Sequence, residues 1–188
     1  MRKLCVSASL AWGMLFAAAP PRIELRDTKG AMHKPAEWRD KRAVILFFMM
    51  TDCPLANGYV PEMNRMRGEY EARGVAFYAV QSDNTASEAV VQKYAQEFGY
   101  TFPVLNDPRL TLARFTGANV TPEVAILSPA GEVLYLGRID NKVEDLTHPR
   151  YAATEPELRN ALDAVLAGKM PKQARTRAVG CAINLESK

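Results

Sequence analysis

Residues 43–62, AVILFFMMTDCPLANGYVPE, contain the stretch of sequence that decides the fold. Residues 43–50 are a continuous apolar run with the length and composition of a strand buried on both faces. Cys53 follows at once, and Pro54 after it suits the first position of a helix, because its missing N–H would have no partner there. The stretch therefore predicts a strand that passes directly into a helix, with a thiol at the junction.

The position of Cys53 bears on its chemistry. The first turn of a helix leaves backbone N–H groups unpaired and carries the positive end of the helix dipole, and both favour a thiolate over a thiol. Thr51 and Asp52, just before it, are of the types that cap helices. The alternative is a small buried hydrophobic residue, since free cysteine is often buried. We interpret Cys53 as a reactive thiol.

Composition sets the outer limits. The chain has 188 residues, of which 48% are hydrophobic and 24% charged, which is enough for one domain with a full core. The net charge is only +3 and the charges are interspersed along the chain. We therefore expect no nucleic acid partner.

Residues 1–19 have a short basic start, an apolar centre and a small-residue end with an Ala-x-Ala cleavage site at 17–19, the form of a secretory signal peptide. A retained N-terminal membrane anchor is the alternative. The segment therefore predicts a secreted or periplasmic protein. Its removal would take Cys5 away, and the remaining cysteines would be Cys53 and Cys181.

Strand and helix patterns alternate along residues 22–168, and the tail, residues 169–188, carries Cys181. The order predicts an α/β fold with a mixed central β-sheet and helices on both faces. Strands are expected at 22–26, 43–50, 75–80, 102–105, 123–127 and 133–139; helices are expected at 54–73, at 85–98 behind a capping box that starts at Thr85, at 107–115 and at 154–168.

These residues resemble the thioredoxin-like fold, in the redoxin branch that contains AhpC/TSA peroxiredoxins and TlpA-like and ResA-like proteins. The resemblance covers residues 22–168. It rests on the Cys53-Pro54 junction, on Pro61 at the position of the kinking proline, and on Thr121-Pro122 at the position of a cis-proline. It implies that Thr121 and Pro122 lie beside Cys53 and that the bond between them is cis.

The sequence departs from this family's patterns in several places. The second cysteine of a Cys-x-x-Cys motif is replaced by Ala56, and Thr51 stands two residues before Cys53, where peroxiredoxins place a hydroxyl three residues before. Arg138 is a candidate for the cation that stabilises the thiolate, or else a surface cation beside Asp140. Asn57, one turn after the thiol, either forms a hydrogen bond near the active site or occupies the solvent face of the helix, and we favour the second interpretation.

Cys181 is the candidate resolving thiol. Three alternatives stay open for it and Cys53: a reversible redox pair, a structural disulfide that holds the tail in place, or two unpaired thiols.

The expected function is that of a thiol-dependent oxidoreductase. The Cys53 thiolate would attack a peroxide or a disulfide, and Cys181 or an external thiol reductant would resolve the product. No organic cofactor or metal is required, and the oligomeric state is left open. The catalytic candidates are Cys53, Cys181 and Thr51, and their expected neighbours are Pro54, Asn57, Thr121, Pro122 and Arg138.

Two other classes of function remain as alternatives. A resemblance to Sco-like copper chaperones would require Cys53, Cys181 and His148 to form a soft metal site. A redox-inactive binding module that retains the fold would require none of these residues.

Overall fold

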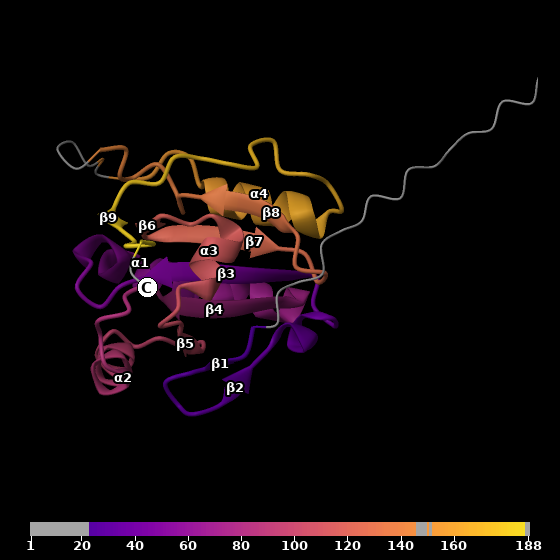
Figure 1. Ribbon diagram of the computed structural model, residues 1–188. Coiled ribbons are helices and arrows are strands. Elements are labelled where there is room, and N and C mark those ends of the chain that lie inside the picture. The colour runs from indigo at the N-terminus through magenta and orange to yellow at the C-terminus, as the bar shows by residue number, and fades with distance from the viewer. Residues whose placement is uncertain (1–22, 146–149, 151, 187–188) are drawn as a thin grey trace, which may run out of the picture.

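The computed structural model describes residues 23–145, 150 and 152–186. At its centre is a five-stranded sheet with the strand order β5-β4-β3-β7-β8 (Figure 1). β3, β4 and β5 run parallel, and β7 and β8 are antiparallel to their neighbours. The strands are β3 (Ala43–Met49), β4 (Val75–Gln81), β5 (Val104–Asn106), β7 (Glu123–Leu127) and β8 (Val133–Gly137). The predicted mixed sheet is confirmed. The proposed signal segment, residues 1–19, and His148 lie outside the described residues.

β3 is buried along its whole length, as expected for a central strand. Alternate residues face opposite sides of the sheet, so this one strand contributes to both halves of the core. Ala43, Ile45, Phe47 and Met49 pack on one side, and Val44, Leu46 and Phe48 pack on the other.

Helices cover both faces of the sheet. Residues of α1 (Pro54–Tyr70), α2 (Glu88–Glu97) and α4 (Glu157–Leu166) belong to the cluster on the first face. The opposite face is covered by α3 (Thr111–Thr116) and the short 3₁₀ helix η1 (Pro35–Trp38), beside a small hairpin of β1 (Leu25–Arg26) and β2 (Met32–His33). A second short 3₁₀ helix, η2 (Glu71–Arg73), follows α1. None of the described helices is both long and apolar enough to cross a membrane.

Some helix starts differ from the expectation. The N-cap of α2 is Ser87, whose hydroxyl accepts the Val90 N–H, whereas Thr85 is bonded to the Asp83 carboxylate. The prediction of a capping box at Thr85 was therefore wrong by two residues. The Thr85 hydroxyl donates to the Asp83 carboxylate in a local turn, so it does not cap the helix that begins after it.

The C-terminal tail crosses the molecule in two steps. It first runs beside the edge strand β8, where the Leu136 N–H donates to the Ala174 carbonyl and the Thr176 N–H donates to the Leu136 carbonyl. It then forms β9 (Cys181–Ala182), which pairs with β6 (Val120–Thr121) (Figure 1). The tail therefore brings Cys181 to the end of the sheet at which α1 starts.

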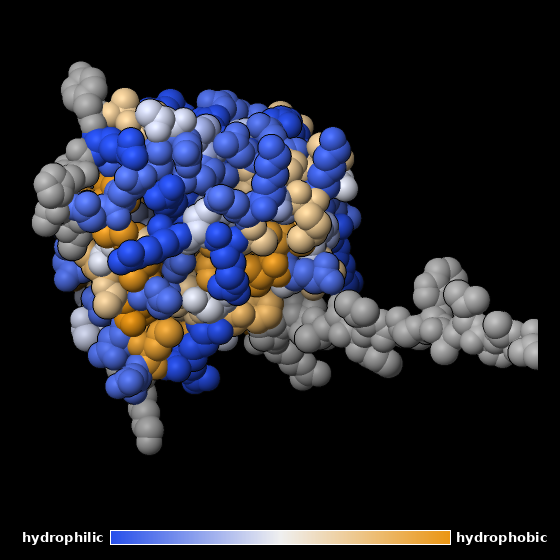
Figure 2. All heavy atoms as spheres, turned by 90° about the horizontal axis from the view of Figure 1, so that it is seen from above, coloured by the Kyte–Doolittle hydropathy of each residue, from blue (hydrophilic) through white to orange (hydrophobic). Residues whose placement is uncertain are grey.

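The surface on the α4 side is mostly polar. Seen from this side, hydrophilic side chains cover most of the molecule and apolar residues form small, interrupted patches (Figure 2). Four large apolar side chains are exposed in the described part of the chain: Val90 and Phe98 lie near the two ends of α2, and Met32 and Met170 lie far from them in the sequence. Scattered exposed apolar residues of this kind are normal for a folded domain.

Candidate active site

Cys53 lies at the junction of β3 and α1, as the sequence predicts. It is itself the N-cap residue of α1, with φ −89° and ψ 102°, and Pro54 is the first residue of the helix. Thr51 lies in the turn before it and is half-buried. The position of the thiol at the N-cap places its sulfur among the N–H groups that the first helical turn leaves unpaired.

Cys53 is completely buried, and its thiol has a defined partner. The S–H donates to the carbonyl oxygen of Thr121 at 3.1 Å. Thr121 precedes Pro122 through a cis peptide bond, so the cis bond expected from the resemblance is confirmed. The Thr121 hydroxyl is fully buried and has no hydrogen-bond partner within the described part of the chain.

Cys181 lies directly opposite Thr121 in the short antiparallel pair of β6 and β9. This register brings its thiol into hydrogen-bonding contact with Cys53, and both residues are free thiols. The structure therefore brings together Cys53 and Cys181, the nucleophile and the resolving thiol expected from the sequence.

The environment of Cys53 favours its thiolate. Burial raises the pKa of the thiol, but the side chains of Cys181 and Thr121 oppose this effect. The backbone N–H groups of Ala56 and Cys181 also favour the charged form, and the pKa falls below its ordinary value. Hydrogen bonds to a thiolate and a helix N-terminus both act in this direction.

The pKa of Cys181 moves the opposite way. Burial raises it first, and the hydrogen bond to Cys53, the negative charge of Cys53 and that of Asp52 raise it further, to about 12. The two thiols thus titrate as a pair that loses its first proton easily and its second with difficulty. The first thiolate to form belongs to Cys53.

Asn57 lies one turn after Cys53, where it is half-buried and hydrogen-bonded instead of exposed on the solvent face that we favoured for it. Its Oδ1 accepts a hydrogen bond of 2.5 Å from the Tyr94 hydroxyl, which is also 3.3 Å from the Tyr100 hydroxyl. Burial raises the pKa of Tyr94, and the negative charge of Cys53 contributes to this shift. Sequence analysis assigned Tyr94 only to the buried face of a helix, although a buried tyrosine usually needs a partner for its hydroxyl.

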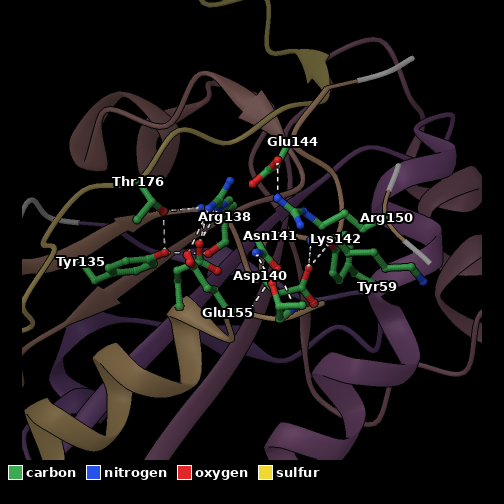
Figure 3. A network of polar contacts seen from close by, with 12 residues as sticks. Tyr59, Tyr135, Arg138, Asp140, Asn141, Lys142, Glu144, Arg150, Glu155 and Thr176 are labelled. Atoms are coloured by element: carbon green, nitrogen blue, oxygen red, sulfur yellow. Dashed lines mark hydrogen bonds and ion pairs between the residues drawn. The ribbon is translucent and has the colours of Figure 1, made fainter. Parts of the chain in front are cut away.

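Arg138 does not lie with the thiols. Its guanidinium forms an ion pair with Glu157 at the start of α4 and lies 3.8 Å from Glu155 (Figure 3). Its backbone N–H donates to the Thr176 hydroxyl at 3.0 Å. Its guanidinium is thus engaged by carboxylates, so the structure gives no support to its proposed role as a thiolate-stabilising cation.

A polar network surrounds this ion pair and extends to α1. Tyr59 donates to the Asp140 carboxylate at 2.6 Å, and the Lys142 N–H donates to the same oxygen at 2.9 Å (Figure 3). Asn141 is bonded to Thr154 through both ends of its amide. These contacts hold the loop after β8 against α1, one and a half turns from the thiol.

Metal ligands are not gathered at this site. Within residues 23–145, 150 and 152–186, no group of three or more His, Cys, Asp or Glu side chains could hold a metal ion. The third ligand of the copper alternative, His148, lies outside these residues. His33 is half-buried, and its two ring nitrogens lie within hydrogen-bonding distance of the carboxylates of Asp27 and Glu37.

Comparison with known proteins identifies the family. The model of the AhpC/TSA family matches residues 17–136, which include β3, the Cys53 junction and the cis-proline. The chain belongs to the AhpC/TSA family. This AhpC/TSA protein is 28% identical over 126 residues to thiol-disulfide oxidoreductase ResA of Halalkalibacterium halodurans, a match that covers 65% of this chain and 64% of that one. It is 30% identical over 113 residues to ResA of Geobacillus kaustophilus, covering 60% and 63%. Both matches span less than two thirds of the relative's length.

Solved structures confirm the thioredoxin-like fold of this AhpC/TSA protein. A hypothetical protein from Sinorhizobium meliloti has a TM-score of 0.74 and 26% identity, covering 91% of this chain and 94% of that one. A secreted Mycobacterium tuberculosis disulfide oxidoreductase homologous to E. coli DsbE has a TM-score of 0.55 and 18% identity, covering 78% and 94%. At 18% identity, the second likeness concerns the fold alone.

Proposed function

We propose that this protein is a thiol-disulfide oxidoreductase in which Cys53 is the nucleophile and Cys181 the resolving thiol. The observation that carries the proposal is the contact between the two thiols, combined with opposite shifts of their pKa values. The names of the ResA relatives agree with this class of reaction.

The first step is attack by the Cys53 thiolate on one sulfur of a substrate disulfide. A bond forms between Cys53 Sγ and that sulfur, the substrate S–S bond breaks, and the other substrate sulfur leaves as a thiolate. Cys53 is suited to this step because it is the more acidic thiol of the pair.

The second step is attack by Cys181 on Cys53 Sγ. The mixed disulfide carries no charge on Cys53, so one cause of the raised Cys181 pKa is removed once the first step is complete. Cys181 loses its proton, its thiolate forms the Cys53–Cys181 disulfide, and the bond between Cys53 Sγ and the substrate breaks. The substrate sulfur leaves as a thiolate that takes up a proton, and an external thiol reductant later returns two electrons to the protein. The order of attack thus follows from the charges of the pair.

Disulfides are favoured over peroxides as substrates. The largest effects that favour the Cys53 thiolate come from Cys181, Thr121 and Ala56, and the cation expected from the sequence, Arg138, is paired with Glu157. A peroxide site of the peroxiredoxin type would use such a cation, together with a hydroxyl three residues before the thiol, where this chain has Met50.

Turnover assays test the proposal. The purified protein, supplied with excess thiol reductant, should reduce a disulfide substrate such as glutathione disulfide faster than it reduces hydrogen peroxide. Disulfide reduction that continues unchanged in Cys53→Ser would contradict the proposal, and faster turnover of peroxide would instead favour the peroxidase alternative.

Export is a separate part of the proposal. Residues 1–19 are proposed to be a signal peptide that is removed on secretion to a periplasmic or extracellular compartment. Expression of the full chain in a bacterium, followed by fractionation and intact mass measurement, tests this. Recovery of the uncleaved chain in the cytoplasm would contradict it.

A further inference from the structure

The tail passes Thr121 at a distance that only glycine permits. An ideal Cβ built on Gly180 would lie 2.0 Å from the Thr121 carbonyl oxygen, 2.7 Å from its carbonyl carbon and 3.2 Å from Pro122 Cδ. Backbone atoms cannot turn aside as a flexible side chain does, so any other residue at this position requires a shift of the tail or of the Thr121 peptide.

The Thr121 peptide has little freedom to move. Thr121 is fully buried, and its carbonyl oxygen is the one that accepts the Cys53 S–H. The tail is more exposed and is held on either side of Gly180. Beyond it, the Ile183 N–H donates to the Asn119 carbonyl and the Ile183 side chain is buried. Before it, Thr176 is hydrogen-bonded to β8. A side chain at position 180 would therefore displace the tail.

Displacement of the tail would separate the two thiols, because Cys181 is the next residue and faces Thr121 in the register of β6 and β9. We propose that Gly180 is a positioning residue: the absence of a side chain lets the tail pack on the Thr121 carbonyl and thereby holds Cys181 against Cys53. This inference rests on the proposed pairing of Cys53 with Cys181.

The consequence for the reaction concerns its second step. Attack on Cys53 Sγ requires Cys181 at bonding distance and in line with the breaking S–S bond, and a misplacement of about 1 Å can slow such a step by roughly 100-fold. Attack by Cys53 on the substrate does not use the Cys181 thiol. A substitution at Gly180 should therefore affect resolution much more than the initial attack.

The test compares Gly180→Ala with the wild-type protein in reaction with glutathione disulfide. Acid quenching and intact mass measurement separate the Cys53–glutathione mixed disulfide from the Cys53–Cys181 disulfide. We expect the mixed disulfide to form in both proteins, and its conversion to be roughly 10- to 100-fold slower in Gly180→Ala. Equal rates of conversion would overturn the inference.

Gly68→Ala is the matched control. Gly68 lies within α1, a Cβ there would meet nothing within 4 Å, and alanine favours the helix. Its conversion rate should equal that of the wild type. Failure of Gly180→Ala to fold, judged by circular dichroism, would also overturn the inference, since Gly180 would then support the whole fold. Failure of wild-type Cys53 to form any mixed disulfide would instead contradict the proposed function.

A second readout separates positioning from a general structural effect. Both proteins are placed in a Cys181→Ser background, and the rate of Cys53 alkylation is followed against pH. Because the Cys181 backbone N–H favours the Cys53 thiolate, Gly180→Ala should move the alkylation midpoint to higher pH. An unchanged midpoint would show that the tail has not moved.

Discussion

The two cysteines of the site are held in position by different kinds of structure. Cys53 lies between a fully buried strand and a long helix, and its place is set by residues next to it in the sequence. Cys181 lies in a strand of two residues, and its place is set by contacts with β6 and β8, far away in the sequence. The position of the Cys53 thiol is therefore fixed by the core of the domain, whereas the position of the Cys181 thiol depends on the packing of the C-terminal tail.

The largest expected effect is that of Cys53→Ser. Disulfide reduction should be lost, because a serine hydroxyl is not ionised near neutral pH and does not attack disulfides. A steady-state assay with excess reductant measures this. Cys181→Ser is the matched variant: it should still form one mixed disulfide per chain but should not resolve it unaided. Release of the second substrate thiol by Cys181→Ser at the wild-type rate, in a single turnover without an external thiol, would remove Cys181 from the mechanism.

Removal of the Cys181 thiol should also make Cys53 less reactive. Cys181→Ala takes away a side chain that favours the Cys53 thiolate, so the Cys53 pKa should rise and alkylation at pH 7 should slow by roughly tenfold. Cys181→Ser retains a hydroxyl donor and should lie between the wild type and Cys181→Ala. Iodoacetamide kinetics measure this, and equal rates in all three proteins would contradict the coupling of the pair.

Thr121→Val should separate reactivity from stability. The buried Thr121 hydroxyl has no hydrogen-bond partner among the described residues while Cys53 is protonated, but it favours the Cys53 thiolate, so its loss should raise the Cys53 pKa and slow alkylation by a few-fold. The free energy of unfolding should stay level or rise by about 1 kcal/mol, because an unsatisfied polar group is replaced by a methyl group. A large loss of stability, measured by urea denaturation, would indicate a structural hydroxyl instead.

The stability of the reduced protein should depend on pH in two opposite ways. The folded-state pKa of Cys53 is lowered, so stability should increase as the pH rises from that value to the unfolded value of about 8.5. The folded-state pKa of Cys181 is raised to about 12, so stability should decrease as the pH rises above about 8.5. Urea midpoints in the presence of a reductant should therefore pass through a maximum that is absent from the Cys53→Ser/Cys181→Ser variant.

The smallest effect on the thiols is expected from Arg138→Gln. The ion pair with Glu157 would be lost and a buried carboxylate left without its cation, which should lower the free energy of unfolding by about 1 to 3 kcal/mol. The alkylation rate of Cys53 should not change. A slower rate would restore the role that the sequence suggested for this arginine.

The comparison also explains what the sequence could predict. The strand, the thiol and the helix at residues 43–70 follow from a continuous apolar run and from Pro54, which are local patterns. The mixed sheet follows in the same way from the order of the elements. The cis bond at Pro122 was expected through the family resemblance.

The contacts of the tail could not be predicted in this way. A two-residue strand has no periodic pattern, and Gly180 reads in the sequence as an ordinary loop glycine. Its importance comes from a close approach to Thr121, which only the folded chain shows. The partner of Arg138 was missed for a similar reason, because Glu157 lies on an element whose position depends on the packing of α4.

The most direct test of the account is a redox titration of the two thiols. The protein is equilibrated with mixtures of reduced and oxidised dithiothreitol, alkylated, and measured by mass spectrometry. The account predicts that Cys53 and Cys181 lose reactivity together, in one reversible two-electron transition, as the mixture becomes more oxidising. Two thiols that remain open to alkylation in every mixture would contradict it.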